Sequence, residues 1–376
     1  MKIAVVAHIR HRVAAPFMGG MEAHCHTLTN ALRRRGHEVT LFAARGSCDE
    51  DLTAICEPYE EVLPWVRWRG TDRLARYQRE AFAGAWDSIA RGAFDVVHNN
   101  SLFPELIEWA GRDRIPMLTS QHVPPFGAMH DAVEDVGALD WLQFSVTSQS
   151  QLGLWSPAAR RNMHVVYNGI DLAEWPVQKH RGNRLLWFGR ITENKGLREA
   201  IEAASRAEVA LDIAGSIEDR PYFDHWVMPY LGETIRYLGH LGGDALRQRV
   251  SRALACIVTP MWDEPFGLVA AEAMACGVPV IAFDRGAMRE VLGACGALVP
   301  AGNVQALAKA MRLARTLDGA ACREEIASRF SIDAMLDGYE RCYAQAMAAA
   351  ALPGSRADCP EAACASSSAT TEALLA

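Results

Sequence analysis

Four charged residues stand where their side chains could bind a diphosphate and a set of hydroxyl groups. Glu264 and Glu272 lie in the stretch T-P-M-W-D-E-P-F-G-L-V-A-A-E-A-M-A-C-G, and Arg190 and Lys195 lie in F-G-R-I-T-E-N-K-G. An arginine fork and a lysine point charge can together neutralise a diphosphate. A carboxylate beside such an anion is repelled unless it faces something else, so we expect the two glutamates to accept hydrogen bonds from sugar hydroxyls.

The elements around these residues place them at the ends of strands. The apolar run Ala253–Val258 predicts a strand, Leu268–Cys276 predicts a helix, and the loop between them holds Glu264. Open α/β sheets bind ligands at the ends of their strands, and the N–H groups at a helix start attract anions. Taken alone, Lys195 would more often be a solvated surface charge. Its scarcity, as one of four lysines, and its place beside Gly196 at a strand end favour a functional role.

A pair of glycines, Gly19 and Gly20, precedes another predicted helix. Without a Cβ, such a pair lets the backbone come close to a phosphate or a sugar. A plain tight turn between strand and helix is an equally good interpretation. The pair is not part of a G-x-G-x-x-G motif, and the chain holds no Walker lysine motif. Dinucleotide-binding dehydrogenases and P-loop nucleotidases therefore lose their main support.

Size and composition limit the class of protein. With 376 residues, 50% of them apolar, the chain can bury two ordinary cores. A net charge of −7 gives no support for nucleic-acid binding. The ten cysteines form no C-x-x-C pair, so neither a zinc site nor a disulfide framework is indicated. Neither a signal peptide nor an apolar run of roughly 20 residues is found, so we expect a cytoplasmic protein with reduced thiols.

Strand-like apolar runs alternate with helix-length amphipathic segments, and the pattern occurs twice. The first series of strands is expected at Ile3–Ala7, Glu38–Ala43, Phe94–His98, Pro116–Thr119 and Phe144–Thr147, with helices at Met21–Arg35, Asp72–Arg91 and Ser101–Arg112. The second series is expected at Leu185–Phe188, Ala210–Ala214, Ile235–Leu238, Ala255–Val258, Val278–Ala282 and Ala297–Val299, with helices at Gly196–Ser205, Gly243–Arg252, Leu268–Cys276 and Asn303–Ala314. Such alternation predicts an α/β protein with two Rossmann-like, doubly wound parallel sheets whose ligand sites face each other across a cleft.

The motifs resemble those of the family 4 retaining glycosyltransferases, which have the GT-B fold. G-R-I-T-E-N-K-G followed by E-P-F-G-L-V-A-A-E-A-M-A-C-G-V-P-V-I-A is similar to the signature of that family. Glu264 and Glu272 are separated by seven residues, as in its E-x7-E motif. G-G-M-E resembles its glycine-rich acceptor-side loop, and V-Y-N-G-I-D resembles its link into the donor domain. The resemblance covers nearly all of residues 1–350 in order and spacing.

The resemblance implies a domain organisation. Residues 1–172 would form the acceptor-side domain and residues 173–330 the donor domain. The segment 331–350 would form a helix that returns to the first domain, although an ordinary C-terminal helix on the second domain is an equally good interpretation from the sequence alone. Residues 351–376, which turn to Ala, Ser, Thr, Pro and Cys, are expected to be disordered.

Family roles can be carried to individual residues on the donor side. Arg190 and Lys195 would hold the donor diphosphate, and Glu272 would accept hydrogen bonds from the ribose hydroxyls. Glu264 would bind hydroxyls of the transferred sugar. Backbone groups would assist at Phe266, Gly267, Leu268 and Val269.

Further positions are implied by local matches. His122, in T-S-Q-H-V-P-P, matches a histidine that lines the donor-sugar pocket in the family; without the resemblance, a core histidine near a Pro-Pro turn is the better interpretation. His240, in G-H-L after a predicted strand, lies where the family holds the nucleotide base. Gly19 and Gly20 would form the acceptor-side loop.

The chemistry implied by the resemblance needs no metal and no other cofactor. No D-x-D-type pair stands in a context that suggests a divalent cation. Positive side chains and a helix start would therefore stabilise the leaving phosphate. In this family, retention of configuration is described as same-face attack, in which the departing phosphate oxygen takes the acceptor proton. No protein nucleophile is then required.

The expected partners are a nucleotide-sugar donor, UDP- or GDP-linked, and an acceptor that is a small molecule, a lipid or a glycan. The motifs also resemble bacterial family members labelled UDP-glucose:tetrahydrobiopterin glucosyltransferases, but no residue can be assigned to a pterin. An arginine–tryptophan stretch at Trp65–Arg69, followed by Arg73, Arg76 and Arg79, raises the question of membrane contact. A solvated helix face or the pocket of a soluble acceptor is the favoured interpretation.

Two other functions are compatible with the same motifs. A nucleotide-sugar epimerase or hydrolase of GT-B shape would use carboxylates around the anomeric carbon and would release nucleotide without an acceptor. A non-catalytic nucleotide-sugar-binding subunit would keep the pocket without turnover, but the presence of all four charged residues disfavours it.

Overall fold

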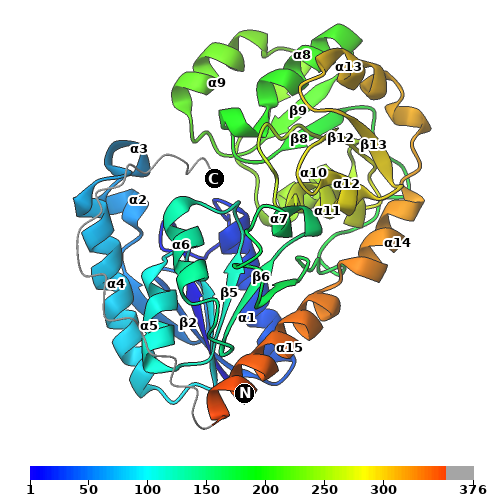
Figure 1. Ribbon diagram of the computed structural model, residues 1–376. Coiled ribbons are helices and arrows are strands. Elements are labelled where there is room, and N and C mark those ends of the chain that lie inside the picture. Colours follow the sequence, from blue (N-terminus) through cyan, green and yellow to red (C-terminus); the bar gives the residue numbers. More distant parts are fainter. Residues whose placement is uncertain (353–376) are drawn as a thin grey trace.

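The protein folds into two α/β units that lie side by side (Figure 1). The structure, a computed structural model, describes residues 1–352. The tail that was expected to be disordered, 351–376, lies outside the described residues from residue 353 onward. In the described part of the chain, no helix is both long and apolar enough to cross a membrane.

The first unit contains the sheet nearest the N-terminus. Its strands are β1 (Lys2–Ala7), β2 (Glu38–Ala44), β3 (Leu52–Cys56), β4 (Val96–Asn100), β5 (Met117–Gln121), β6 (Leu142–Val146) and β7 (Met163–Val165). Its helices are α1 (Gly20–Arg34), α2 (Tyr59–Val62), α3 (Trp65–Trp68), α4 (Asp72–Arg91), α5 (Glu105–Asp113), α6 (Gly127–Asp135) and α7 (Gln149–Leu152). The strand order is β3-β2-β1-β4-β5-β6-β7.

The second unit repeats this layout with different connections. Its strands are β8 (Leu185–Phe188), β9 (Leu211–Ala214), β10 (Ile235–Tyr237), β11 (Cys256–Val258), β12 (Val280–Asp284) and β13 (Gly296–Pro300). Its helices are α8 (Leu197–Ala207), α9 (Arg220–Trp226), α10 (Gly243–Ser251), α11 (Leu268–Ala275), α12 (Met288–Leu292), α13 (Val304–Arg312) and α14 (Ala320–Arg329), with 3-10 turns η1 (Glu193–Lys195), η2 (Met228–Tyr230) and η3 (Ala314–Thr316). The strand order is β10-β9-β8-β11-β12-β13, and the strand pairs of both sheets, within the residues described, are parallel. This confirms the predicted pair of doubly wound sheets.

The central strands are apolar on both faces because helices cover both faces. In β1, Ile3, Val5 and Ala7 pack in one cluster with the buried side of α1, whereas Ala4 and Val6 pack in another with α4 and α5. Strand β8 divides in the same way between two clusters of the second unit. Because these strands are continuous apolar runs, the sequence predicts them correctly.

Strands β3 and β7 and several short helices are not predicted by the sequence pattern. β3 and β7 stand at the two edges of the first sheet, where a strand has only one neighbour. β3 is only partly buried, and β7 has three residues. The helices without a periodic signal are short, from 4 residues in α2 to 10 in α14, and comprise α2, α3, α6, α7, α9, α12 and α14.

The last described helix, α15 (Ile332–Ala351), starts beside the second unit and runs along the first (Figure 1). Its side chains share a core cluster with β1 and α1. Arg35, which follows α1, pairs with Glu340 of α15 at 3.0 Å. At the start of α15, Ser331 pairs with Ile170 of the other connection between the units. The two chain crossings therefore lie side by side, and α15 ties the units together.

A buried hydrogen bond joins α15 to the sheet of the first unit. The Tyr343 hydroxyl lies 2.6 Å from Nδ1 of His98, and Nε2 of the same ring lies 2.7 Å from the Ser120 hydroxyl. His98 and Tyr343 are both fully buried. Burial, with a smaller effect of His122, lowers the pKa of His98 to about 3, so the ring is neutral and needs both partners.

Tyr343→Phe is expected to lower the free energy of unfolding by about 1–3 kcal/mol, because one ring nitrogen of His98 loses its partner in a buried site. Urea unfolding followed by tryptophan fluorescence measures the change. Tyr230→Phe, at a side chain that is 50% exposed, is the matched control. Equal stabilities for the two variants would show that the buried bond contributes nothing to the attachment of α15.

Candidate active site

A cavity of about 1300 Å³ lies between the two units and is lined by residues from both. Much of its wall follows directly after strands, the position at which parallel α/β sheets bind ligands. The structure places every residue predicted for the substrate site in this wall: Gly19, Gly20, His122, Arg190, Lys195, His240, Glu264, Phe266, Gly267, Leu268, Val269 and Glu272.

Lys195 ends the turn η1 after β8, and the neighbouring strand β11 fixes that turn. Gly196 has φ of +67°, and a Cβ there would lie 1.9 Å from the Thr259 carbonyl oxygen, so only glycine fits. The Thr259 hydroxyl lies 3.1 Å from the Lys195 carbonyl oxygen and 2.8 Å from that of Gly196. The Lys195 ammonium donates to Oε2 of Glu264 at 2.7 Å. The packing of this turn against Thr259 therefore places the Lys195 ammonium and the Glu264 carboxylate together in the cavity wall.

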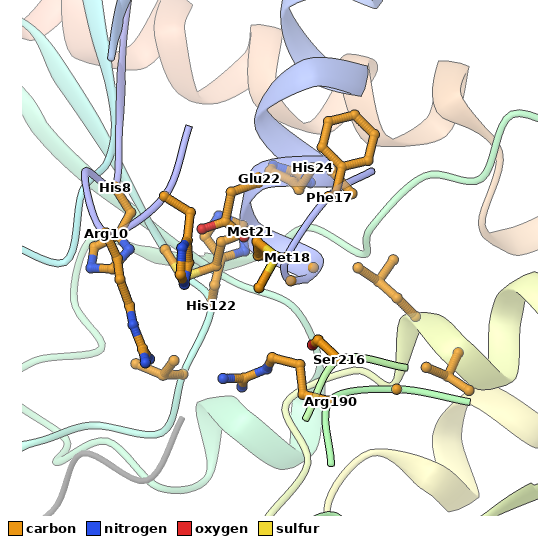
Figure 2. Close-up of a pocket in the computed structure, with 18 of the residues that line it drawn as sticks. His8, Arg10, Phe17, Met18, Met21, Glu22, His24, His122, Arg190 and Ser216 are labelled. Carbon is orange, nitrogen blue, oxygen red and sulfur yellow. The ribbon is translucent and has the colours of Figure 1, made fainter. Parts of the chain in front are cut away.

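Arg10 and Arg190 point into the cavity from opposite units (Figure 2), and Glu218 joins them. Arg190 Nη1 donates to Oε2 of Glu218 at 2.8 Å, and Nη2 of Arg10 lies 3.3 Å from Oε1 of the same residue. Arg10 Nε donates to Glu60 at 2.8 Å. Alternating charges thus cross the cleft, and a diphosphate that binds Arg190 has to share it with Glu218.

The start of α11 faces the cavity without a capping side chain. Its N-cap, Gly267, has φ of +88°, and a Cβ there would lie 2.1 Å from the Met288 methyl group. The loop before it is anchored, because the backbone N–H of Ala287 donates to the Glu264 carbonyl oxygen at 2.8 Å. The first N–H groups of a helix have no acceptor within the helix, and the helix dipole adds positive charge there. Anions are therefore favoured at Leu268 and Val269.

Glu272, on α11, lines the cavity and is partly exposed, while its carboxyl group is surrounded by protein atoms. This burial raises the pKa of Glu272 to about 8; Arg247 lowers it and Glu174 raises it further. At neutral pH the carboxyl group therefore carries its proton for most of the time. Hydroxyl donors from a ligand would favour its ionised form.

His122 lines the cavity on the side of the first unit (Figure 2). Burial lowers its pKa to about 4, so it is neutral near pH 7. Its Nε2 lies 2.7 Å from the side-chain oxygen of Asn100, which can only accept, so Nε2 carries the proton and Nδ1 is an acceptor. Its ring packs against His24, with centroids 4.5 Å apart. The side chain is suited to accept a hydrogen bond from a ligand.

The two glycines and His240 lie where the units touch. A Cβ on Gly20 would come 3.0 Å from the Leu268 side chain of the second unit. On Gly19 it would come equally close to Oε2 of Glu22. His240 Nε2 lies 3.2 Å from the Phe17 carbonyl oxygen across the cleft. Gly20 thus lies close to the second unit, whereas the approach of the pair to a phosphate or a sugar stays a prediction.

Arg10, Glu22, Glu218 and Trp262 line the same cavity and are not singled out by the sequence motifs. Arg10 and Glu218 each follow a strand of the fold, β1 and β9, within four residues. Their position as charged residues just after a predicted strand is therefore the sequence feature that could have identified Arg10 and Glu218 as site residues. Glu22 lies in G-G-M-E and Trp262 lies two residues before Glu264. Their position beside predicted site residues was the signal in the sequence.

Comparison with known proteins matches both units. The family model described as "Glycosyltransferase Family 4" matches residues 18–174, and that described as "Glycosyl transferases group 1" matches residues 182–315. The chain is 28% identical over 363 residues to a glycogen synthase of Mycobacterium tuberculosis, covering 83% of this chain and 86% of the relative. It is 27% identical over 317 residues to a phosphatidyl-myo-inositol mannosyltransferase of Mycobacterium leprae, covering 78% and 83%. Among solved structures, Anabaena HepE in complex with UDP-glucose matches with a TM-score of 0.69 and 16% identity, covering 92% of this chain and 100% of that one.

Two parallel sheets facing one cavity, together with these relatives, define the class: the protein is a glycosyltransferase with the GT-B fold. The two family matches follow each other along the chain, and the second match, residues 182–315, contains both the G-R-I-T-E-N-K-G motif and the E-x7-E motif. The chain belongs to glycosyltransferase family 4, as the resemblance of its motifs implied.

Proposed function

We propose that this protein is a retaining glycosyltransferase that moves a hexose from a UDP- or GDP-linked donor to an acceptor hydroxyl without a divalent metal. The observation that carries the proposal is the meeting of Arg190, Lys195, the α11 start and Glu272 at one wall of the cavity. Two cations and an uncapped helix start suit a diphosphate. A buried carboxyl group beside them suits the ribose hydroxyls.

The units divide the substrates between them in this proposal. Residues 173–330 bind the donor, with its transferred sugar between Glu264 and His122. Residues 1–172 bind the acceptor, and the helix in 331–350 holds that half in place. Trp65 lines the cavity, which supports the interpretation of the arginine–tryptophan stretch as part of an acceptor pocket. We place the protein in the cytoplasm, where nucleotide sugars are available to it.

Arg190 and Lys195 act on the leaving group. As the bond between the anomeric carbon and the phosphate oxygen breaks, negative charge grows on the diphosphate, and preorganised cations stabilise that charge. The acceptor oxygen forms its bond to the anomeric carbon on the same face. The acceptor proton passes to the departing phosphate oxygen, so the step needs neither a protein nucleophile nor a metal.

The acceptor is a hydroxyl of a small molecule, a lipid or a glycan. Because the motifs resemble those of bacterial tetrahydrobiopterin glucosyltransferases, a reduced pterin is the first compound to test. The acceptor side of the cavity is compatible with a ring system, because Tyr59, Trp65, Phe103 and Phe126 line it.

A thermal-shift panel of UDP-, GDP-, ADP- and dTDP-sugars tests the donor. A ligand at about 100 times its Kd adds about 2.7 kcal/mol to stability, so the correct nucleotide should raise the melting temperature clearly above the others. No response to any member of the panel would contradict the proposed function.

The transfer itself is tested by nucleotide release. With the donor found in the panel, release should be slow alone and should rise when the matching acceptor pool is added. Release that is fast and independent of any acceptor would identify an epimerase or hydrolase instead. Donor binding without release under any condition would identify a binding subunit.

A further inference from the structure

Trp262, two residues before Glu264, belongs to a closed triangle of side chains. Its indole Nε1–H donates to Oε2 of Glu264 at 2.8 Å, and the Lys195 ammonium donates to the same oxygen at 2.7 Å. The ammonium also lies 4.7 Å from the centroid of a Trp262 ring. Each member of the triangle therefore contacts the other two.

The backbone on both sides of Trp262 is fixed. The N–H of Met261 donates to the Asn194 carbonyl oxygen at 2.8 Å, in the turn that ends at Lys195. A Cβ on Gly286, whose φ is +60°, would lie 2.3 Å from the Glu264 nitrogen, so that strand-end turn packs directly on the loop. The indole consequently has a defined position, and its N–H is aimed by the loop.

A bound diphosphate would affect the two hydrogen-bond donors to Glu264, Lys195 Nζ and Trp262 Nε1, in different ways. A bound diphosphate attracts the Lys195 ammonium, which is a mobile point charge on a long stem. The indole N–H is uncharged and held by its loop, so it competes poorly for phosphate and stays on the carboxylate. Without it, Glu264 would follow the ammonium or turn toward water.

Resting on the donor placement proposed above, we propose that Trp262 is a positioning residue that keeps Glu264 turned toward the transferred sugar while Lys195 binds the diphosphate. Trp262 thus allows Lys195 to leave Oε2 of Glu264 for the diphosphate while Glu264 keeps its orientation toward the sugar. Because the nucleotide does not contact Glu264 in this arrangement, only the sugar part of the donor should sense the indole N–H.

The test compares the affinities of UDP-glucose and UDP, measured by calorimetry, in the wild type and in Trp262→Phe. Phenylalanine keeps an aromatic face for Lys195 but removes the N–H donor. We expect the Kd of UDP-glucose to rise about tenfold, as for a lost hydrogen bond to a charged group. The Kd of UDP should change less than about twofold. If the panel selects GDP, the matching GDP-sugar and GDP are the probes.

Trp86→Phe is the matched control. Its Nε1–H donates to a carboxylate as well, Asp113 at 2.7 Å, but in the first unit and away from the cavity. This variant should leave both affinities unchanged. Trp262→Leu, which removes ring and N–H together, should weaken UDP as well as UDP-glucose, because the face under Lys195 is lost.

The outcomes separate this inference from the proposed function. Equal weakening of UDP and UDP-glucose in Trp262→Phe would show a merely structural side chain and overturn the inference, leaving the proposed function intact. Unchanged binding of both ligands would overturn it as well. A wild-type protein that binds neither a nucleotide sugar nor a nucleotide would remove the proposed function itself.

Discussion

Lys195→Ala should lower kcat by about two orders of magnitude or more. The ammonium stands at the cavity wall, where the proposed leaving diphosphate would gain charge, and a preorganised charge in a partly enclosed site acts more strongly than the same charge in water. The interaction grows as the bond breaks, so its loss appears mainly in kcat. Glu264 keeps the Trp262 N–H in this variant, so the loop should not collapse.

Steady-state kinetics with the donor selected by the panel gives the measurement. Lys195→Met preserves the length of the side chain over Trp262 and should lose as much kcat, because the charge and not the stem is responsible. Lys309→Ala removes an exposed lysine on α13 and should behave as the wild type. Near-normal turnover in both Lys195 variants would remove this residue from the reaction.

The local parts of the site could be predicted from the sequence. Lys195 and Gly196 stand directly after the apolar run of β8, and Glu264, Gly267 and Glu272 follow β11 with helix-forming residues behind them. Short-range patterns place such residues at the ends of parallel strands. Their common cavity then follows from the parallel direction of all strands in one sheet.

Contacts between the units could not be predicted in this way. Arg10 and Glu218 are separated by most of the chain, and their 3.3 Å contact depends on how the two sheets are set against each other. The relative orientation of the two units is fixed by long-range contacts such as the pairing of Ile170 with Ser331 and the hydrogen bond between Tyr343 and His98. The pKa of Glu272 escaped prediction for a related reason, because burial arises only when β11, α10 and the segment before β8 enclose it.

The second large effect is expected at Glu272, as a dependence of nucleotide affinity on pH. Burial raises the pKa of its carboxyl group from the usual 4.5 to about 8. For the free protein this lowers the free energy of unfolding as pH rises from about 4.5 to about 8, since the unfolded chain ionises first. The neighbouring thiols of Cys256 and Cys276 do not titrate in this range, because burial raises the pKa of both. Glu22 also lines the cavity with a raised pKa, so the comparison with Glu272→Gln is what isolates the contribution of Glu272.

In the proposed arrangement ribose hydroxyls donate to the ionised carboxylate, so nucleotide binding should release a proton from Glu272 below pH 8. The Kd of UDP should then fall by about tenfold per pH unit between about pH 6 and 8 and level off above that range. Glu272→Gln imitates the protonated acid. It should match the wild type within about twofold at pH 6 and bind UDP about 100-fold more weakly at pH 8.5, where the wild-type carboxylate makes charge-assisted hydrogen bonds.

Isothermal calorimetry in two buffers of different ionisation enthalpy measures both the affinity and the proton released. Ionisation of the nucleotide itself contributes equally to wild type and variant, so the difference between their slopes belongs to Glu272. Parallel pH profiles for the two proteins would mean that Glu272 does not ionise on binding. The buried carboxyl group would then have to act as a hydrogen-bond donor, and the ribose would be held by its acceptor oxygens instead.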